Sequence, residues 1–179
     1  VIVATIFMLI YIAIRFKNVR FGASAVIALI HDVLVVFTVY AVIRLSVGNT
    51  FIACMLTILG YSINATIIIF DRCRENIKPL KGQKDIPYAE IGDQSVRENM
   101  RRSLFTTFTT LVTVAFLAIF GSDTIREFCV PIILGLVAGL YSSVLLATPL
   151  WAGLSVEFDK VAAKYRKTKA TYVKENEED

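Results

Sequence analysis

Long apolar runs alternate with shorter polar segments along the whole chain. Crossing the ~30 Å hydrocarbon layer of a bilayer takes about 20 consecutive, mostly apolar residues of α-helix. Five runs follow this pattern, the first being short and expected to continue upstream: 1–14, 21–43, 50–70, 103–120 and 128–150. The pattern predicts an all-α membrane protein, a polytopic bundle of five transmembrane helices within 1–154, followed by a charged tail over 155–179.

The longest polar segment, 71–102, separates the third run from the fourth. Pro79 and Gly82 favour turns in its first half. Ser95 followed three residues later by Glu98 is typical of a helix start. We therefore expect a loop and then a short helix over 88–100, which lies on the membrane surface or runs into the fourth span.

The third run carries a stripe of polar and small residues. At ~100° per residue, one helical face holds all four of its members, Thr57, Gly60, Tyr61 and Asn64. Asp71 and Glu75 continue the same stripe beyond the run. A polar side chain in hydrocarbon is costly unless another group bonds it. We therefore expect this helix to lie inside a bundle with the stripe turned inward and Gly60 packed against a neighbour.

His31 and Asp32 lie near the middle of the second run, about ten residues from either end. A titratable pair at this depth is a functional-site hypothesis by default, because ionisable groups are rare inside membranes. The alternative is that both side chains only bond neighbouring helices and fix their packing. The sequence alone leaves both interpretations open.

Small residues form a strip along the last run. Gly135 and Gly139 have GxxxG spacing, and Ser143 lies one turn further on. Such strips let transmembrane helices approach closely, so we expect helix packing here. The fourth run is instead rich in threonine, with Arg102 at its start. Consecutive hydroxyl-bearing turns indicate that one side of that helix faces other helices or water.

The distribution of charge predicts the orientation. The chain is 56% hydrophobic with a net charge of +4. Seventeen of its 19 Lys and Arg residues lie in 15–20, 71–102 and the tail, and the other two are Arg44 and Arg126. By the positive-inside rule these three segments are cytoplasmic and Val1 is outside. The basic half of the tail is expected to lie along anionic lipids, and no nucleic-acid partner is expected.

Residue patterns typical of enzymes and metal sites are missing from the sequence. It contains no nucleophile–base constellation, phosphate-binding glycine loop or metal-ligand set. The three cysteines, Cys54, Cys73 and Cys129, show no CxxC spacing and are expected to be small buried residues. We expect neither an enzyme nor a bound cofactor.

The motif GYSIN-x-T followed by IFDR-x-REN, at residues 60–76, resembles the signature of the SecF family and of the SecF half of fused SecDF proteins. The pair His31-Asp32, the arginine and threonines that open the fourth run, and the stretch 135–149 resemble further motifs of that family. The likeness covers its five carboxy-terminal helices and implies an RND-like half-bundle. One position departs: the family commonly has aspartate where this chain has Ala65.

The resemblance implies an accessory subunit of the protein-export machinery in the bacterial cytoplasmic membrane. Such a subunit pairs with SecD and helps to draw preproteins through the SecYEG channel, using a proton or sodium gradient. Arg102 matches the relay arginine of the family. The ion-relay candidates are Asp32, His31, Arg102 and Asn64, and the cytoplasmic motif comprises Asp71, Arg72, Arg74 and Glu75. Because Ala65 supplies no carboxylate, the proton-carrying group is expected in the SecD partner or at Asp32.

Two other functions remain open at this stage. The chain could be a scaffold that holds its SecD partner without carrying ions, which Ala65 favours. It could also be half of an RND-type exporter of small molecules or lipids. In the scaffold, polar mutations in the membrane would change only the stability of the complex. The exporter would differ from the first function in the size of the whole protein.

Overall fold

The computed structural model describes residues 18–44, 48–80 and 86–175, with side chains up to residue 161 except those of Ile43, Asn49 and Thr50. Every regular element in this part of the chain is helical. The helices are α2 (Val19–Ile43), α3 (Asn49–Ile77), α4 (Tyr88–Phe120), α5 (Asp123–Ser142) and α6 (Thr148–Glu175). A 3₁₀ turn, η1 (Lys78–Leu80), follows α3, and a π-helical turn, η2 (Ser143–Ala147), joins α5 to α6.

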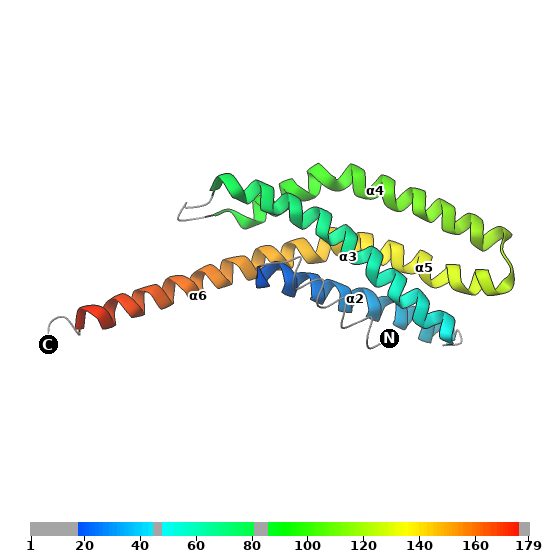
Figure 1. Ribbon diagram of the computed structural model, residues 1–179, viewed down its shortest axis with the longest axis horizontal. Coiled ribbons are helices and arrows are strands. Elements are labelled where there is room, and N and C mark those ends of the chain that lie inside the picture. Colours follow the sequence, from blue (N-terminus) through cyan, green and yellow to red (C-terminus); the bar gives the residue numbers. More distant parts are fainter. Residues whose placement is uncertain (1–17, 45–47, 81–85, 176–179) are drawn as a thin grey trace.

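Four described helical stretches are long and apolar enough to cross a membrane: Val19–Val42, Phe51–Leu80, Tyr88–Phe120 and Asp123–Val161. The last comprises α5, η2 and the start of α6, which follow one another without a break (Figure 1). The expected first span, 1–14, lies outside the described residues. The fold is thus an all-α membrane bundle, and the described residues include four of its five expected spans.

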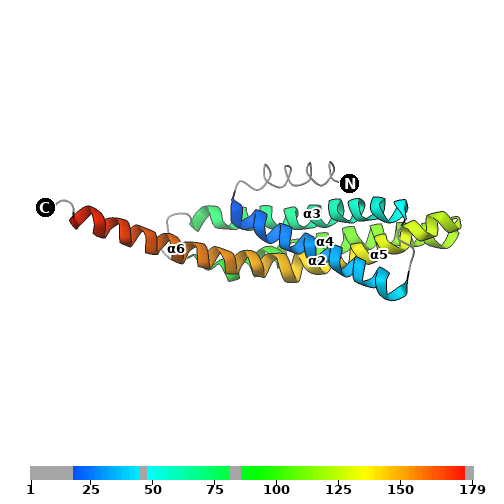
Figure 2. The same ribbon diagram turned by 90° about the horizontal axis from the view of Figure 1, so that it is seen from below.

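The helices extend further than the apolar runs. The segment 71–102 is predicted to begin as a loop, but α3 continues to Ile77. The predicted helix over 88–100 is confirmed, because α4 begins at Tyr88 and runs unbroken through the fourth span. Hydrogen bonds between their side chains hold the ends of α3 and α4 together. Asn76 of α3 donates one of 2.9 Å to Ser95 of α4. α6 likewise continues past the apolar run, and it projects beyond the other helices in Figure 2.

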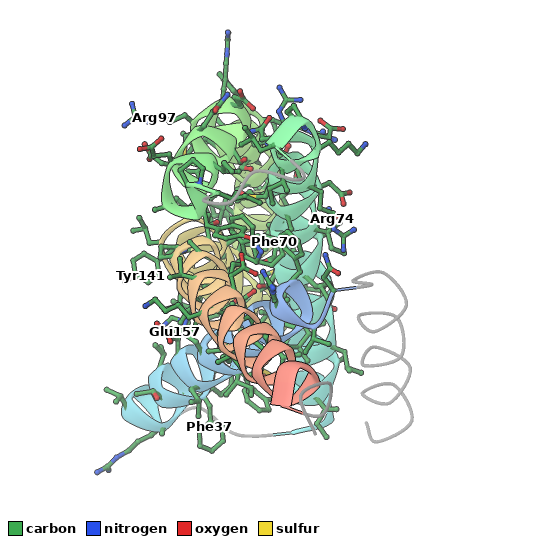
Figure 3. All side chains as sticks on the ribbon, turned by 90° about the vertical axis from the view of Figure 1, so that its left-hand side faces the viewer. Phe37, Phe70, Arg74, Arg97, Tyr141 and Glu157 are labelled. Carbon is green, nitrogen blue, oxygen red and sulfur yellow. The ribbon has the colours of Figure 1, made fainter. Side chains whose placement is uncertain are left out.

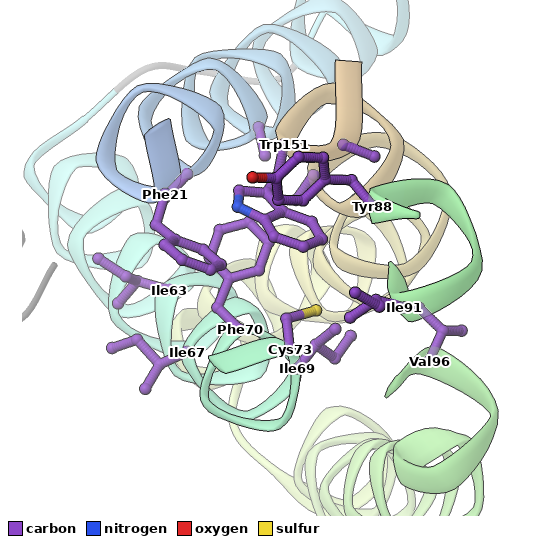
Figure 4. Close-up of a cluster of buried hydrophobic side chains, with 14 of the residues drawn as sticks. Phe21, Ile63, Ile67, Ile69, Phe70, Cys73, Tyr88, Ile91, Val96 and Trp151 are labelled. Carbon is purple, nitrogen blue, oxygen red and sulfur yellow. The ribbon is translucent and has the colours of Figure 1, made fainter. Parts of the chain in front are cut away.

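The core at this projecting end is aromatic. Trp151 of α6 stacks on Phe21 of α2 with ring centroids 4.9 Å apart, and Tyr88 of α4 meets Trp151 edge-on at 5.8 Å. Phe70 of α3 completes the cluster (Figure 4). Viewed from this end in Figure 3, Phe70 points between the helices, whereas Arg97 points outward. Four helices therefore share one buried aromatic contact.

Small residues bring α5 against α3. A Cβ atom on Gly135 would lie 2.3 Å from Cγ1 of Ile58, and one on Gly139 would lie 3.2 Å from the Cβ of Ser62. Ser143 is fully buried at the start of η2. Gly60 differs from expectation, because no atom of the described residues lies within 4 Å of its Cβ position. Gly60 therefore faces away from the described helices.

Replacing Gly135 with alanine should destabilise the bundle by about 1–3 kcal/mol, because the added methyl group overlaps Ile58. The free energy of unfolding in detergent micelles would measure this. Gly153→Ala is the matched control, since nothing lies within 4 Å of that Cβ position; alanine there should stabilise the helix by up to about 1 kcal/mol. Equal effects at the two glycines would contradict the close contact.

Candidate functional site: a buried carboxylate between three helices

Asp32 is completely buried where α2, α3 and α5 meet. The hydroxyl groups of Ser62 and Ser142 both donate hydrogen bonds to its Oδ2, the second at 2.8 Å. Nδ1 of His31 lies 3.3 Å from Oδ1. A buried carboxylate without donors would be strongly destabilising. The three helices therefore meet around a carboxyl group whose two oxygens both have polar neighbours.

A glycine on α5 and the π-helical turn after it position these hydroxyl groups beside Asp32. Gly139, one turn before Ser142, lets the backbone of α5 approach Ser62. Ser142 is the last residue of α5 before η2. There the wider π-helical turn leaves the Ser143 carbonyl to accept a 3.1 Å hydrogen bond from the hydroxyl of Thr148, five residues later. π-Helical turns are rare and often occur at functional sites.

This arrangement can accommodate either protonation state of Asp32. Serine hydroxyls rotate and act as donors or acceptors, so they can bond a carboxylate or a carboxylic acid. The side chain of His31 is 34% exposed, and its ring lies 6.1 Å from that of the exposed Tyr141. His31 therefore connects the buried carboxyl group to the surface of this chain. Chemically, the site offers hydrogen bonds to a buried carboxyl group that lies beside a partly exposed imidazole.

The other relay candidates lie elsewhere. The buried face of α3 carries Cys54, Ile58, Ser62 and Thr66. Asn64 lies on the opposite face and is exposed, as are Thr57 and Gly60. Within the described part of the chain, these three residues therefore face outward, contrary to the predicted inward stripe. Only Tyr61 turns toward a neighbour, donating to the Thr107 hydroxyl of α4 at 3.1 Å.

Arg102 is also exposed, on α4. No salt bridge joins its guanidinium to another side chain in the described part of the chain, and its backbone carbonyl accepts a hydrogen bond from Thr106 at 2.8 Å. Further along α4, Thr110 and Thr113 likewise bond carbonyls one turn earlier. The structure thus brings His31 and Asp32 together and leaves Arg102 and Asn64 on an outer surface, without contact to the carboxylate.

The charged motif after the third span links α3 to its neighbours. Arg72 bonds both Glu75, at 2.7 Å, and Glu98 of α4. Arg74 lies 3.6 Å from Asp71 and stacks over the ring of Phe21, 5.0 Å from its centroid. These residues hold the extended part of α3 against α4 and α2.

Sequence reasoning missed several of the residues that matter here. Ser62 lies within the GYSIN motif, and its spacing of four from Ile58 and Thr66 on a second face was the available signal. A further cluster had no local signal: Arg20 of α2 pairs with Asp159 of α6 at 2.6 Å, and Tyr88 of α4 donates to the same carboxylate. Those partners are 139 and 71 residues apart in the sequence.

Metal-ligand clusters of three or more His, Cys, Asp or Glu side chains do not occur among the described residues. Cys54, Cys73 and Cys129 are buried free thiols. Cys54 donates to the backbone carbonyl of Phe128 at 3.4 Å, which is a packing contact between α3 and α5.

A family model and individual relatives all place this chain beside the same group of proteins. The family model described as "Protein export membrane protein SecD/SecF, C-terminal" matches residues 1–157. Protein translocase subunit SecF of Alicyclobacillus acidocaldarius is 44% identical over 151 residues, which is 84% of this chain and 49% of that protein. SecF of Sebaldella termitidis is 47% identical over 146 residues, which is 82% of this chain and 46% of that protein.

Fused relatives match the same region. Protein translocase subunit SecDF of Bacillus subtilis is 38% identical over 151 residues, covering 84% of this chain and 20% of that protein. A crystal structure of SecDF in its super-membrane-facing form superposes with a TM-score of 0.78 at 34% identity, covering 89% of this chain and 21% of the other. The chain therefore spans about half the length of the SecF relatives described and about a fifth of the SecDF proteins.

Removing one of the two hydroxyl groups that donate to Asp32 should destabilise the protein. Ser142→Ala leaves the buried carboxylate one donor short, so the free energy of unfolding in micelles should fall by about 1–3 kcal/mol. Thr38→Ala is the matched control, because that hydroxyl is exposed and bonds only the Leu34 carbonyl of its own helix; its effect should stay within about 0.5 kcal/mol. Equal losses in the two variants would show that Asp32 does not depend on Ser142.

Proposed function

The chain belongs to the SecD/SecF family of protein export membrane proteins, and we propose that it is a SecF-like subunit that uses an ion gradient to assist preprotein translocation through the Sec channel. The observation that carries this proposal is the burial of Asp32 among membrane-spanning helices. Ionisable groups at such positions commonly mark ion pathways, because their burial is too costly to persist without a role.

Protonation of Asp32 would act on three helices at once. A carboxylate draws the hydroxyls of Ser62 and Ser142 toward one oxygen, whereas a carboxylic acid binds such donors more weakly and itself becomes a donor. Passage of a proton or a sodium ion would therefore alter how α2 is held against α3 and α5. Such a change is a physical means of coupling an ion gradient to helix movement.

A SecD-type partner would cover the exposed polar stripe. Asn64 is exposed within an apolar helix, and no other described side chain hydrogen-bonds its amide. Hydrocarbon cannot satisfy that amide, whereas helices of a partner can. The relative named SecDF supports a SecD-type partner. Arg102 would face the same partner, which would supply the carboxylate that Ala65 does not.

The orientation proposed from the charge distribution places the Trp151 end of the bundle in the cytoplasm. The cluster in which Arg20 and Tyr88 both contact Asp159 lies at that end. The DR-x-REN motif lies there too. This chain would then contact the SecYEG channel within the plane of the membrane or on its outer side, where preproteins emerge.

A scaffold without ion coupling is the second candidate. The separation of Asp32 from Arg102 and Asn64, and the absence of a carboxylate at Ala65, favour it. In that case the hydrogen bonds of Asp32 serve only to fix helix packing, and polar mutations change the stability of the complex and nothing else.

Asp32→Asn should separate the two functions. The amide keeps the size of the side chain but cannot exchange a proton, so ion conductance and preprotein export in proteoliposomes should both fall by an order of magnitude or more while the complex stays assembled. Arg102→Ala should lower both in the same way. Arg101→Ala is the matched control, because its guanidinium stacks over Phe105 of its own helix at 5.7 Å. Unchanged export and conductance in the first two variants would leave only the scaffold.

A cysteine in place of Asn64 should crosslink to cysteines placed on the membrane helices of a SecD-type partner. The exposed stripe of α3 would lie within reach of those helices, whereas the three native thiols are buried. Ala41→Cys is the matched control, since Ala41 is exposed on another helix, α2. The proposed interface would be wrong if position 41 formed crosslinks as efficiently as position 64.

A further inference from the structure

Glu98 of α4 accepts three hydrogen bonds at the end of the bundle that carries the DR-x-REN motif. Its Oε2 accepts from Nε of Arg72 and, at 3.3 Å, from Nδ2 of Asn76, both on α3. Its Oε1 accepts from Nε2 of Gln94, one turn earlier on α4, at 2.9 Å. A carboxylate has about four acceptor sites. Among the described residues no further donor reaches Oε1, so this oxygen retains acceptor capacity.

Arg102 lies one turn after Glu98 on the same face of α4. Side chains four residues apart on a helix are neighbours, with Cβ atoms about 5–6 Å apart, and an acidic residue that precedes a basic one is the favourable order. Arg102 is exposed, and within the described part of the chain its guanidinium has no carboxylate partner. Glu98 is the nearest carboxylate to it along α4.

The contacts between α3 and α4 show what lies level with Arg102. The two helices run antiparallel (Figure 1), and Tyr61 of α3 bonds Thr107 of α4. Glu98 bonds residues further along α3. Between these two levels, Arg102 lies within one turn of Ala65, which is half-buried and four residues from Tyr61 on the face that contacts α4. This turn of α3 therefore offers Arg102 no carboxylate.

We propose that Glu98 is a positioning residue of the ion relay: its remaining acceptor site holds the guanidinium of Arg102 beside α3, at the start of the apolar run, and so sets where Arg102 meets the partner. This inference rests on the proposed role of Arg102 in the relay. An arginine at the edge of an apolar run keeps its charge and extends toward the nearest polar group. Glu98 supplies that group from a fixed place, because α3 holds its carboxylate.

The alternative is that Glu98 only fastens α3 to α4. Arg72 also bonds Glu75 of its own helix at 2.7 Å. Asn76 also bonds Ser95 of α4 at 2.9 Å, so the fastening does not depend on Glu98 alone. The amide oxygen of a glutamine at this position could still accept from Arg72, whereas it carries no charge to hold a second guanidinium. The charge of Glu98 therefore distinguishes the two roles.

Glu98→Gln tests this role in the complex assembled with a SecD-type partner. Ion conductance and preprotein export in proteoliposomes should each fall by roughly two- to five-fold, the range for loss of one exposed ion pair. Glu98→Asp keeps the charge and should retain most of both activities. Asp93→Asn is the matched control, because Asp93 pairs with Arg97 four residues later on the same helix, at 2.9 Å, and Arg97 points outward (Figure 3). It should leave both activities unchanged.

Two double variants separate positioning from fastening. Ala65→Asp provides a carboxylate on α3 within one turn of Arg102, so it should restore the activities that Glu98→Gln loses. In an Arg102→Ala background, Glu98→Gln should cause no further loss, because residues that act as one unit are not additive. Loss of a residue that only fastens the helices would be independent of Arg102 and would not be restored by Ala65→Asp.

Unchanged activities in Glu98→Gln, a loss of the same size in Asp93→Asn, additive losses with Arg102→Ala, or no restoration by Ala65→Asp would each overturn the inference. Arg102→Ala alone separates it from the proposed function. If Arg102→Ala lowers both activities and Glu98→Gln does not, only the role of Glu98 is wrong. If Arg102→Ala changes neither activity, Arg102 has no relay role and Glu98 has nothing to position. The free energy of unfolding of each variant in micelles would verify that it folds.

Discussion

A carboxyl group buried between three helices constrains how this bundle is assembled. Hydrocarbon offers no hydrogen bonds, so the protein itself must supply every donor that Asp32 needs. The donors come from Ser62 on α3 and Ser142 on α5, and these two helices approach closely because Gly135 and Gly139 lie between them. Electrostatics and packing thus impose the same arrangement: the glycines allow the contact, and the carboxylate makes it specific.

In the described part of the bundle, a polar surface on the outer face of α3 is left uncovered. α3 is polar on two opposite faces, one closed by Ser62 against Asp32 and the other open at Asn64. A helix in a lipid environment tolerates the first face but not the second unless another protein segment covers it. This asymmetry agrees with membership of the SecD/SecF family, in which relatives named SecDF carry more than this region in one chain.

A continuous helical rod joins the carboxylate to the projecting end of the molecule. It passes from Ser142, which touches Asp32, through η2 to Trp151 and Asp159. At that end, the aromatic cluster and the ion pair of Arg20 with Asp159 tie the rod to α2, while Tyr88 ties it to α4. The rod therefore contacts α2 at two levels, once in the membrane interior and once near the charged end.

The amino-acid sequence by itself determined the helical class, the approximate spans and the depth of Asp32, because these follow from the length of apolar runs and the cost of charge in hydrocarbon. It did not decide which face of α3 points inward, since periodicity defines faces but not their neighbours. Ser62, with a polar residue two positions away on the other face, could have been assigned either way. Only the tertiary structure paired Asp32 with Ser142, 110 residues distant, and Arg20 with Asp159. It also carried α3 past its apolar run, because the polar end of α3 is held against α4 by contacts such as that of Asn76 with Ser95.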